Sequence, residues 1–182
     1  MNRVEIKIGG FGGQGVILAG MIIGRAGAIY NGKEATLTQS FGPEARGGSC
    51  SAQVVISPTR NLYPCVINPD VLLVMSQPAY NRYHTEVRPG GLLLFEESLV
   101  KAVEHATDVK AFGIPAARLA ENLGRKMVLN IVMVGFFAAL SDVVTVEAIE
   151  KAVVDLVPQG TEELNRAAFK SGYQFGQTVR HG

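Results

Sequence analysis

Short apolar segments recur along the chain and alternate with longer stretches of helical periodicity. Val4, Ile6 and Ile8 alternate with charged residues, which is typical of a strand buried on one face. Residues 71–75 and 92–95 are instead continuously apolar, as in strands buried on both faces of a parallel sheet. The full pattern predicts strands at residues 3–8, 34–41, 51–57, 71–75, 92–95 and 108–112.

Helical periodicity fills most of the intervals between these strands. Residues 16–30 are apolar nearly all round, so the helix predicted there is largely buried. Gly20, Gly24 and Gly27 recur on it at helical spacing, and each glycine costs about 1 kcal/mol relative to alanine inside a helix. This cost predicts a close neighbour on that face, which we expect to be the sheet. Further helices are predicted at residues 77–87, 115–124, 128–140, 145–156 and 161–179.

The alternation of strands and helices predicts a single α/β domain over residues 1–182. We expect a Rossmann-like three-layer α/β/α sandwich, with helices on both faces of a mostly parallel central sheet. The strands at 34–41 and 51–57 are joined by one loop and can pair antiparallel, so we expect the sheet to be mixed. Ligands of such folds bind beyond the carboxyl ends of the strands. The features expected to gather there are Gly10–Gly15, Gly42–Gly48, Ser76–Gln77 and the start of the helix at 128–140.

Composition narrows the partners that this chain would take. Its 182 residues are 47% hydrophobic and 18% charged, which suits a buried sheet or a subunit that hides part of its surface. The net charge of +1 gives no indication of nucleic acid as a partner. No export signal precedes Val4, and the longest apolar run, Met127–Leu140, is shorter than the roughly 20 residues that span a membrane. We therefore expect a cytoplasmic protein with no membrane partner.

Residues able to carry out catalysis or bind a metal are sparse. Cys50 and Cys65 stand 15 residues apart, outside any C-x-x-C motif, and cannot ligate a zinc ion or an iron–sulfur cluster unaided. His84, His105 and His181 share no motif, so ordinary surface histidines are the simpler interpretation. The sequence contains no nucleophile elbow and no phosphate-binding P-loop motif. It thus predicts neither catalytic residues nor a metal site on this chain.

The densest cluster of glycines follows the first predicted strand and precedes the first helix. Gly10, Gly12 and Gly15 have the G-x-G-x-x-G spacing. Such a turn lets the backbone approach a ligand closely, and the N–H groups of the following helix then face an anionic group. A turn that serves packing alone is the alternative. The candidate cofactor-binding residues of this loop are Gly10, Phe11, Gly12, Gly13, Gln14 and Gly15.

A dinucleotide would require more than this loop. An acidic residue about 20 residues further on should end the second strand and bind the ribose hydroxyls. Glu34 has about the right spacing, but it begins that predicted strand, whose end carries Gln39 and Ser40. The sequence therefore argues against an NAD or FAD site and leaves another anionic ligand open.

Arg46 and Asn130 complete the set of candidate binding residues. Arg46 lies between Glu44 and Gly47-Gly48, in a loop whose N–H groups can form an anion nest, and its guanidinium can bind a phosphate through two hydrogen bonds. A solvent-exposed turn in which Arg46 pairs with Glu44 is the alternative. Asn130 stands inside an otherwise apolar helical pattern, so its amide requires a hydrogen-bond partner. That partner is either a neighbouring segment or a ligand.

Several motifs in combination resemble one protein family. In order they are G-G-F-G-G-Q-G at 9–15, S-F-G-P-E-A-R-G-G at 40–48, P-D-V-L-L-V-M-S-Q-P-A-Y at 69–80, P-G-G at 89–91 and N-I-V-M-V-G at 130–135. With these motifs the chain resembles, over nearly its whole length, the γ subunit of 2-oxoacid:ferredoxin oxidoreductases, most closely the 2-oxoglutarate type. Phe41 departs from the tyrosine expected in the family, a change that the loop geometry should tolerate.

The resemblance implies a reaction in which a 2-oxoacid and coenzyme A give an acyl-CoA and CO2, with ferredoxin as the electron acceptor. The 2-oxoglutarate type forms succinyl-CoA. Thiamine diphosphate and [4Fe-4S] clusters would then lie on partner subunits, expected to be α, β and δ. This chain would contribute to coenzyme A binding and to assembly, through the loop Gly10–Gly15, Arg46 and Asn130.

Two alternatives remain open from the sequence. The first is a γ-type subunit of a pyruvate, branched-chain 2-oxoacid or indolepyruvate enzyme, because substrate choice lies largely on other chains. The second is a stand-alone nucleotide-binding or regulatory module. The proteins that co-purify with the native chain would distinguish the second alternative from any subunit of a complex.

Overall fold

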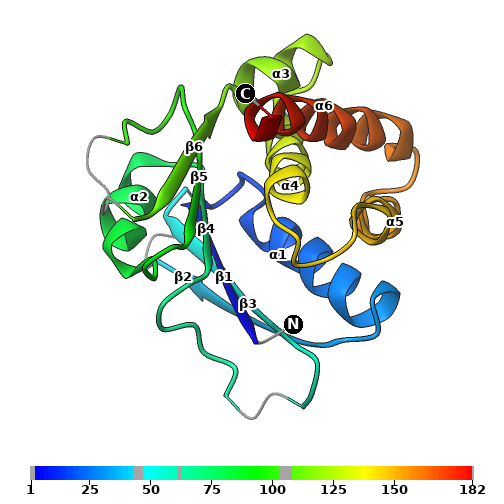
Figure 1. The fold of residues 1–182 in the computed structure, drawn as a ribbon. Helices are drawn as coiled ribbons and strands as arrows, with labels where there is room; N and C mark the ends of the chain where they lie inside the picture. Colours follow the sequence, from blue (N-terminus) through cyan, green and yellow to red (C-terminus); the bar gives the residue numbers. More distant parts are fainter. Residues whose placement is uncertain (1–2, 43–46, 61–62, 103–107, 182) are drawn as a thin grey trace.

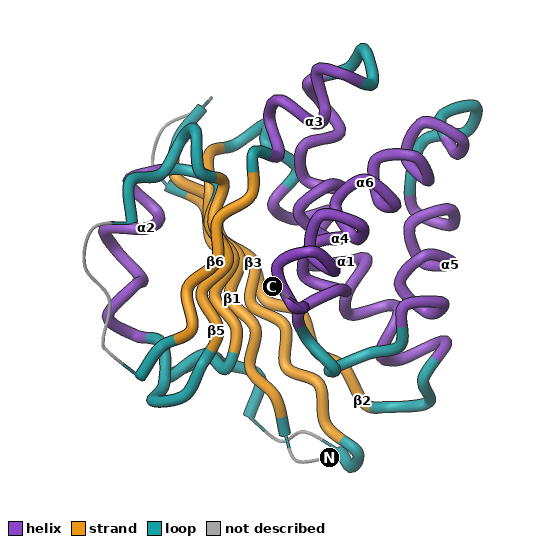
Figure 2. Tube along the Cα trace, turned by 45° about the horizontal axis from the view of Figure 1, so that its top comes forward, coloured by secondary structure: helices purple, strands orange, loops and turns teal. Residues whose placement is uncertain are grey.

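A mixed six-stranded sheet forms the centre of the protein (Figures 1 and 2). The computed structural model describes residues 3–42, 47–60, 63–102 and 108–181. The spatial strand order is β2-β3-β1-β4-β5-β6; β3 is antiparallel to both of its neighbours, and β1, β4, β5 and β6 run parallel. The strands are β1 (Val4–Phe11), β2 (Glu34–Phe41), β3 (Ser49–Ser57), β4 (Val71–Val74), β5 (Leu92–Glu96) and β6 (Lys110–Ile114).

The helices cover the two faces of the sheet unequally. Figure 2 shows α1, α4, α5 and α6 together on one side of the strands, with α2 on the other side. The predicted three-layer α/β/α sandwich is therefore confirmed, and one of its outer layers is much thinner than the other. The helical segments are α1 (Val16–Arg25), η1 (Ala26–Tyr30), α2 (Gln77–Tyr83), η2 (His84–Glu86), α3 (Ala116–Asn122), η3 (Lys126–Val128), α4 (Leu129–Leu140), α5 (Val146–Leu156) and α6 (Glu162–His181).

The continuously apolar strands are buried on both faces, as their sequences predict. In β4, Val71 and Leu73 join the large core under the main helical layer, whereas Leu72 and Val74 join the smaller core under α2. Leu72, Leu73 and Val74 are all fully buried. Side chains of a strand alternate between the faces of a sheet, so only an all-apolar sequence satisfies both cores at once.

The glycines of α1 lie against the sheet, as expected from their spacing. A Cβ atom at Gly20 would stand 2.9 Å from the Cβ of Ala52 on β3, and one at Gly27 in η1 would stand 3.0 Å from Ile56 Cδ1. Real Cβ atoms hardly ever approach other atoms so closely. The low helical propensity of these glycines is therefore offset by the close packing of helix on sheet.

The closest helix–helix contact joins α4 to α6. A Cβ atom at Gly172 on α6 would lie 1.9 Å from the carbonyl oxygen of Val132, and one at Gly135 on α4 would lie 2.1 Å from that of Phe169. The two backbones touch at this crossing, where alanine would be too large. Figures 1 and 2 show α6 beside α4 in the same helical layer.

Several predicted boundaries are wrong, among them those of the strand predicted at 108–112, which runs from Lys110 to Ile114. The first strand does not end at Ile8, because Gly9 and Gly10 continue β1 and pair with Ser51 and Cys50 of β3. The third strand begins at Ser49, two residues earlier than predicted, because it extends to meet this longer β1. The helix predicted at 77–87 ends at Tyr83 and is followed by the short 3-10 turn η2.

Candidate functional site

The glycine loop, residues Gly12–Gly15, connects the end of β1 to the start of α1. Gly13 and Gly15 adopt positive φ values of 95° and 74°, which side chains disfavour. A Cβ atom at Gly15 would also lie 2.3 Å from Asn130 Nδ2, whereas one at Gly13 would meet nothing within 4 Å. The loop is thus tightly packed at Gly15 and open at Gly13, where its backbone is accessible.

Two side-chain amides hold this loop in place. Phe11 N donates to Gln14 Oε1 at 2.6 Å, and Gln14 Nε2 donates to the Met75 carbonyl at 2.9 Å. Asn130 Nδ2 donates to the Gly15 carbonyl at 3.3 Å. The loop is therefore tied both to the end of β4 and to the first turn of α4. The sequence left open whether the Asn130 amide bonds to a neighbouring segment or to a ligand, and in the structure it bonds to a neighbouring segment.

The hairpin that connects β2 and β3 reaches the same place. Gly12 N donates to the Gly48 carbonyl at 2.8 Å, and a Cβ atom at Gly12 would find Gly47 and Gly48 as its nearest neighbours. Arg46 and Glu44, the charged residues predicted to matter in this hairpin, lie outside the described residues. The predicted gathering is thus confirmed for the glycine loop, Gly47–Gly48 and the start of α4. At the end of β4 the contact is made by Met75, because Ser76 caps α2 and Gln77 bonds to Lys101.

A cleft of about 390 Å³ opens beside the glycine loop. Gly13 and Gly15 line one side, and Arg125 and Met127, just before α4, line another. The turn between α5 and α6 closes the cleft with Pro158, Gly160, Thr161 and neighbouring residues. Asn130 lies 97% buried and contributes to the lining. Sequence reasoning identified Asn130 and the loop but missed Arg125, Met127 and the α5–α6 turn.

The electrostatics of this cleft favour an anion. The first turn of α1 contains no acidic residue, and no side chain caps its N-terminus. Arg125 is exposed, and its side chain has no hydrogen bond or ion pair with any residue that the structure describes, whereas the adjacent Lys126 pairs with Glu121 at 2.9 Å. An unopposed helix N-terminus and an available guanidinium therefore lie on one cleft.

The other polar positions singled out from the sequence lie apart from this cleft. Glu34 begins β2 and is exposed at the amino end of that strand, away from the glycine loop, so it cannot serve as a ribose-binding residue there. Cys50 pairs with Gly10 in the sheet and is buried, and burial raises the pKa of its thiol. Cys65 is exposed.

The described part of the chain has neither a cluster of metal ligands nor a membrane-spanning helix. Within residues 3–42, 47–60, 63–102 and 108–181, no three His, Cys, Asp or Glu side chains lie close enough together to hold a metal ion. Among the same residues, no helix has the length and apolar character needed to cross a membrane. The donor set described here does not fit an iron–sulfur cluster, which needs a set of cysteine ligands.

Comparison with known proteins gives consistent matches in sequence and structure. The family model described as pyruvate ferredoxin/flavodoxin oxidoreductase matches residues 5–175. The 2-oxoglutarate synthase subunit KorC of Methanocaldococcus jannaschii is 48% identical over 97% of this chain and 96% of its own length. The protein of the same name from Methanothermobacter thermautotrophicus is 46% identical over 93% of each chain.

One solved structure is similar to this chain in both fold and sequence. The γ subunit of a keto/oxoacid ferredoxin oxidoreductase from Geobacter sulfurreducens superimposes with a TM-score of 0.83 and 38% identity, over 96% of this chain and 99% of that one. The similarity in fold therefore extends over nearly the whole of both chains.

Proposed function

The chain belongs to the pyruvate ferredoxin/flavodoxin oxidoreductase family, and from this premise we propose that it is the γ-type subunit of a multi-subunit 2-oxoglutarate:ferredoxin oxidoreductase. Two relatives that align over more than nine-tenths of their length carry the name 2-oxoglutarate synthase subunit, which supports this substrate. A γ-type subunit of a pyruvate, branched-chain 2-oxoacid or indolepyruvate enzyme is the alternative, because substrate choice would lie largely on the partner subunits.

In the proposed reaction, 2-oxoglutarate and coenzyme A give succinyl-CoA and CO2, and two electrons pass one at a time to ferredoxin. Thiamine diphosphate, when bound to the complex, stabilises the carbanion that loss of CO2 leaves. We assign thiamine diphosphate and the [4Fe-4S] clusters to α, β and δ partner subunits. The whole sequence contains only two cysteines, too few to ligate a [4Fe-4S] cluster unaided, which supports that division of labour. A cytoplasmic complex is part of the proposal.

The role proposed for this chain is to bind the phosphates of coenzyme A. The observation that carries it is the cleft in which the open N-terminus of α1 and Arg125 converge. Coenzyme A carries a diphosphate and a ribose phosphate, so it requires N–H donors and a guanidinium rather than an acidic ribose clamp. The α1 N-terminus would take one phosphate and Arg125 another, while the thioether of exposed Met127 offers apolar contact.

Asn130, Gln14 and Arg46 have different parts in this proposal. Asn130 and Gln14 fix the shape of the loop through the hydrogen bonds described above, so they are positioning residues. Arg46, which directly precedes Gly47 in the sequence, is proposed to neutralise a further phosphate. Replacing Arg46 with alanine should then raise the apparent KM for coenzyme A about tenfold, the effect of losing one charge-assisted hydrogen bond.

The native complex provides the test. The chain is tagged and purified with its natural partners, and reduction of ferredoxin is measured with 2-oxoglutarate, pyruvate and 2-oxoisovalerate in the presence of coenzyme A. We expect partner subunits to co-purify and 2-oxoglutarate to give the highest kcat/KM. A higher kcat/KM with another 2-oxoacid would instead support the alternative, a γ-type subunit of the enzyme for that oxoacid. Purification of the chain alone, with no activity towards any oxoacid, would favour the stand-alone module instead.

A further inference from the structure

The cleft beside the glycine loop has an exposed part and a buried part that differ in chemistry. Arg125 and Gly13, at the proposed phosphate contacts, are exposed. Two asparagines, Asn130 and Asn165, also line the cleft but are only 3% and 6% exposed. The other buried or half-buried side chains of the lining are mostly apolar and include Leu18, Val128, Val157 and Leu164. Apolar walls with a few buried polar groups are typical of small-molecule sites.

The orientation of both asparagine amides is fixed by the groups that they contact. Asn165 Nδ2 donates to the Thr161 carbonyl oxygen at 2.9 Å and to Thr161 Oγ1 at 3.0 Å. Asn130 Nδ2 donates to the Gly15 carbonyl oxygen at 3.3 Å. A carbonyl oxygen can only accept hydrogen bonds, so the nitrogen of each amide must face it. The oxygen atom Oδ1 of each asparagine is therefore turned away from these partners.

Both of these oxygen atoms are unpaired and accessible. Neither Asn130 Oδ1 nor Asn165 Oδ1 accepts a hydrogen bond from any residue that the structure describes. Across those residues, Ser141 Oγ is the only polar atom of a buried side chain that is both sealed from solvent and without a partner. The two asparagine oxygens lack a partner, so they are not sealed. Because both residues line the cleft and are otherwise buried, the open surface of each oxygen faces the cleft.

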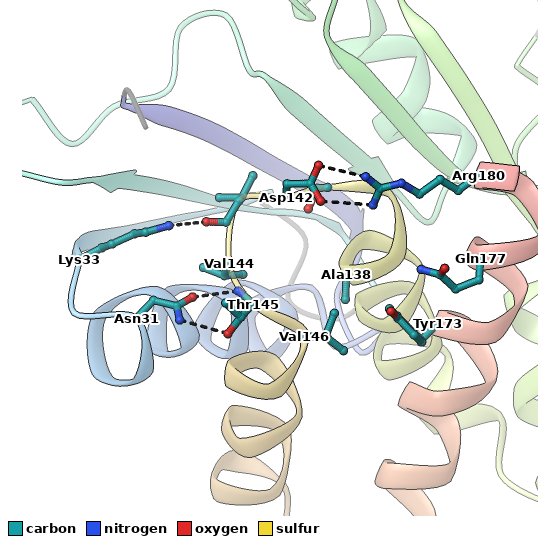
Figure 3. A pocket seen from close by; sticks show the side chains of 12 residues that line it. Asn31, Lys33, Ala138, Asp142, Val144, Thr145, Val146, Tyr173, Gln177 and Arg180 are labelled. Carbon is teal, nitrogen blue, oxygen red and sulfur yellow. Dashed lines mark hydrogen bonds and ion pairs between the residues drawn. The ribbon is translucent and has the colours of Figure 1, made fainter.

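A pocket of about 430 Å³ at the opposite end of α4 provides a contrast (Figure 3). Asn31 lines that pocket, but both ends of its amide are paired. Its Nδ2 donates to Thr145 Oγ1 at 3.1 Å, and its Oδ1 accepts from Thr145 N at 2.9 Å. An asparagine beside a pocket is therefore not in itself a sign of a ligand. The unpaired oxygens are what distinguish the cleft beside the glycine loop.

The unpaired oxygens determine which kind of group suits the buried part of the cleft. An amide oxygen repels a phosphate or a carboxylate, so an anion belongs at the exposed part, near Arg125 and the glycine loop. A buried acceptor that loses water without gaining a donor is destabilising, so the group that enters must bring an N–H donor. The apolar walls favour an uncharged group with an apolar body.

We infer that Asn165 Oδ1, together with Asn130 Oδ1, accepts a hydrogen bond from an uncharged N–H group of the same ligand whose phosphates bind at Arg125 and the glycine loop. This inference rests on the proposed binding of coenzyme A and makes it more specific. Coenzyme A has two donors of this kind, the 6-amino group of adenine and the amide N–H groups of the pantetheine arm. Asn130 would then position the loop through Nδ2 and contact the ligand through Oδ1.

Two analogues of coenzyme A test the inference and distinguish the two donors in the native complex. The first contains unsubstituted purine in place of adenine and so lacks the amino group. In the second, esters replace the pantetheine amides and remove their N–H groups. Both analogues keep the phosphates and the thiol. With the wild-type complex, we expect an apparent KM about tenfold higher for at least one analogue than for coenzyme A, because a buried acceptor is left unpaired.

The variant Asn165→Ala tests whether this side chain recognises the donor. The variant should have a higher KM for coenzyme A, whereas the ratio of the KM for the discriminated analogue to that for coenzyme A should fall towards one. A merely structural role of Asn165 would raise both KM values and leave their ratio unchanged. Asn31→Ala is the matched control, since its amide is fully paired in the other pocket, and it should keep the wild-type ratio.

Equal KM values of the wild-type complex for coenzyme A and both analogues would overturn the inference. So would an unchanged ratio in Asn165→Ala. The wild-type comparison needs no variant, so it decides the outcome even where Asn165→Ala fails to assemble. Either negative result leaves the proposed function intact, because that function requires only that coenzyme A be consumed. Ferredoxin reduction that does not depend on coenzyme A would instead contradict the proposed function.

Discussion

Asn130 Nδ2 donates a hydrogen bond to the carbonyl oxygen of Gly15 across 3.3 Å, and thereby joins the start of α4 to the start of α1. The same carbonyl also accepts from Ala19 N at 3.0 Å, as the first hydrogen bond of α1. Loss of the amide would therefore leave the carbonyl paired. The contribution of Asn130 is to position the loop more than to satisfy a buried group.

Substitutions at Asn130 should measure how much its hydrogen bond to Gly15 contributes to stability. Asn130→Leu should lower the free energy of unfolding by about 1 kcal/mol, the usual contribution of one hydrogen bond. Asn130→Asp should cost more, about 2–3 kcal/mol, because a carboxylate oxygen would then face the Gly15 carbonyl. Urea unfolding of the full chain measures both values. If the aspartate variant is as stable as the leucine variant, the hydrogen bond to Gly15 is not formed in solution.

The two positive-φ glycines of the loop should respond differently to the same substitution. Gly13→Ala should cost only the backbone strain of a left-handed residue, about 1–2 kcal/mol. Gly15→Ala should cost about 3 kcal/mol or more, because the new methyl group also collides with the Asn130 amide. Thermal and urea unfolding give the comparison. Equal losses at the two positions would contradict the packing described at Gly15.

Replacing two helix glycines by alanine should change the stability of the protein in opposite directions. Gly172→Ala should destabilise the protein by about 3 kcal/mol or more, since the methyl group meets the backbone of α4 and no side chain can move aside. Gly24→Ala should stabilise it by up to about 1 kcal/mol, because a Cβ atom there would stand at an ordinary 3.7 Å from Val54 Cγ1. Differential scanning calorimetry of the two variants checks both signs.

Arg125 provides the test of the proposed coenzyme A contact in the native complex. Arg125→Gln should raise the apparent KM for coenzyme A about tenfold and leave kcat unchanged, because the lost interaction is made equally in ground and transition states. Lys126→Gln is the control, since Lys126 pairs with Glu121 outside the cleft. Equal changes in KM at the two positions, or an unchanged KM in Arg125→Gln, would show that Arg125 does not bind coenzyme A.

The two cysteines should differ in reactivity. Cys65 is exposed, whereas Cys50 is buried in β3 and burial raises the pKa of its thiol, so less thiolate is present at a given pH. In the folded chain, iodoacetamide at mildly alkaline pH should therefore modify Cys65 and spare Cys50. Peptide mass spectrometry reads the two sites separately, and urea-unfolded protein, in which both should react, is the control. Rapid modification of Cys50 would show that β3 opens readily.

The sequence was a good guide wherever local pattern determines structure. Strands such as β4 and β5 are recognisable because burial on both faces requires an all-apolar run, and Gly20 and Gly27 indicate the close approach of the sheet. The same reasoning placed Glu34 at the amino end of β2, and the structure confirms that position. These inferences depend on neighbours along the chain or on one face of one element.

The cleft could only be half predicted, because its remaining walls are assembled by tertiary packing. Arg125 and Met127 have no local pattern that marks them, and they meet the turn at 157–161 only because α6 lies across α4. The extension of β1 through Gly9 and Gly10 likewise depends on its register with β3. Strand register is a property of the pair, so the sequence of one strand does not determine it.

The contact between Gly135 and Gly172 also bears on the order in which the protein can fold. α4 is buried along nearly its whole length, but α6 lies about thirty residues further along the chain and is synthesised later. Until α6 is synthesised, the face of α4 that carries Gly135 is exposed to solvent. When α6 then packs on that face, the two helix backbones come into direct contact, so their alignment must be accurate. α6 therefore completes the core of the domain, and this core is protected from aggregation only once α6 has been synthesised.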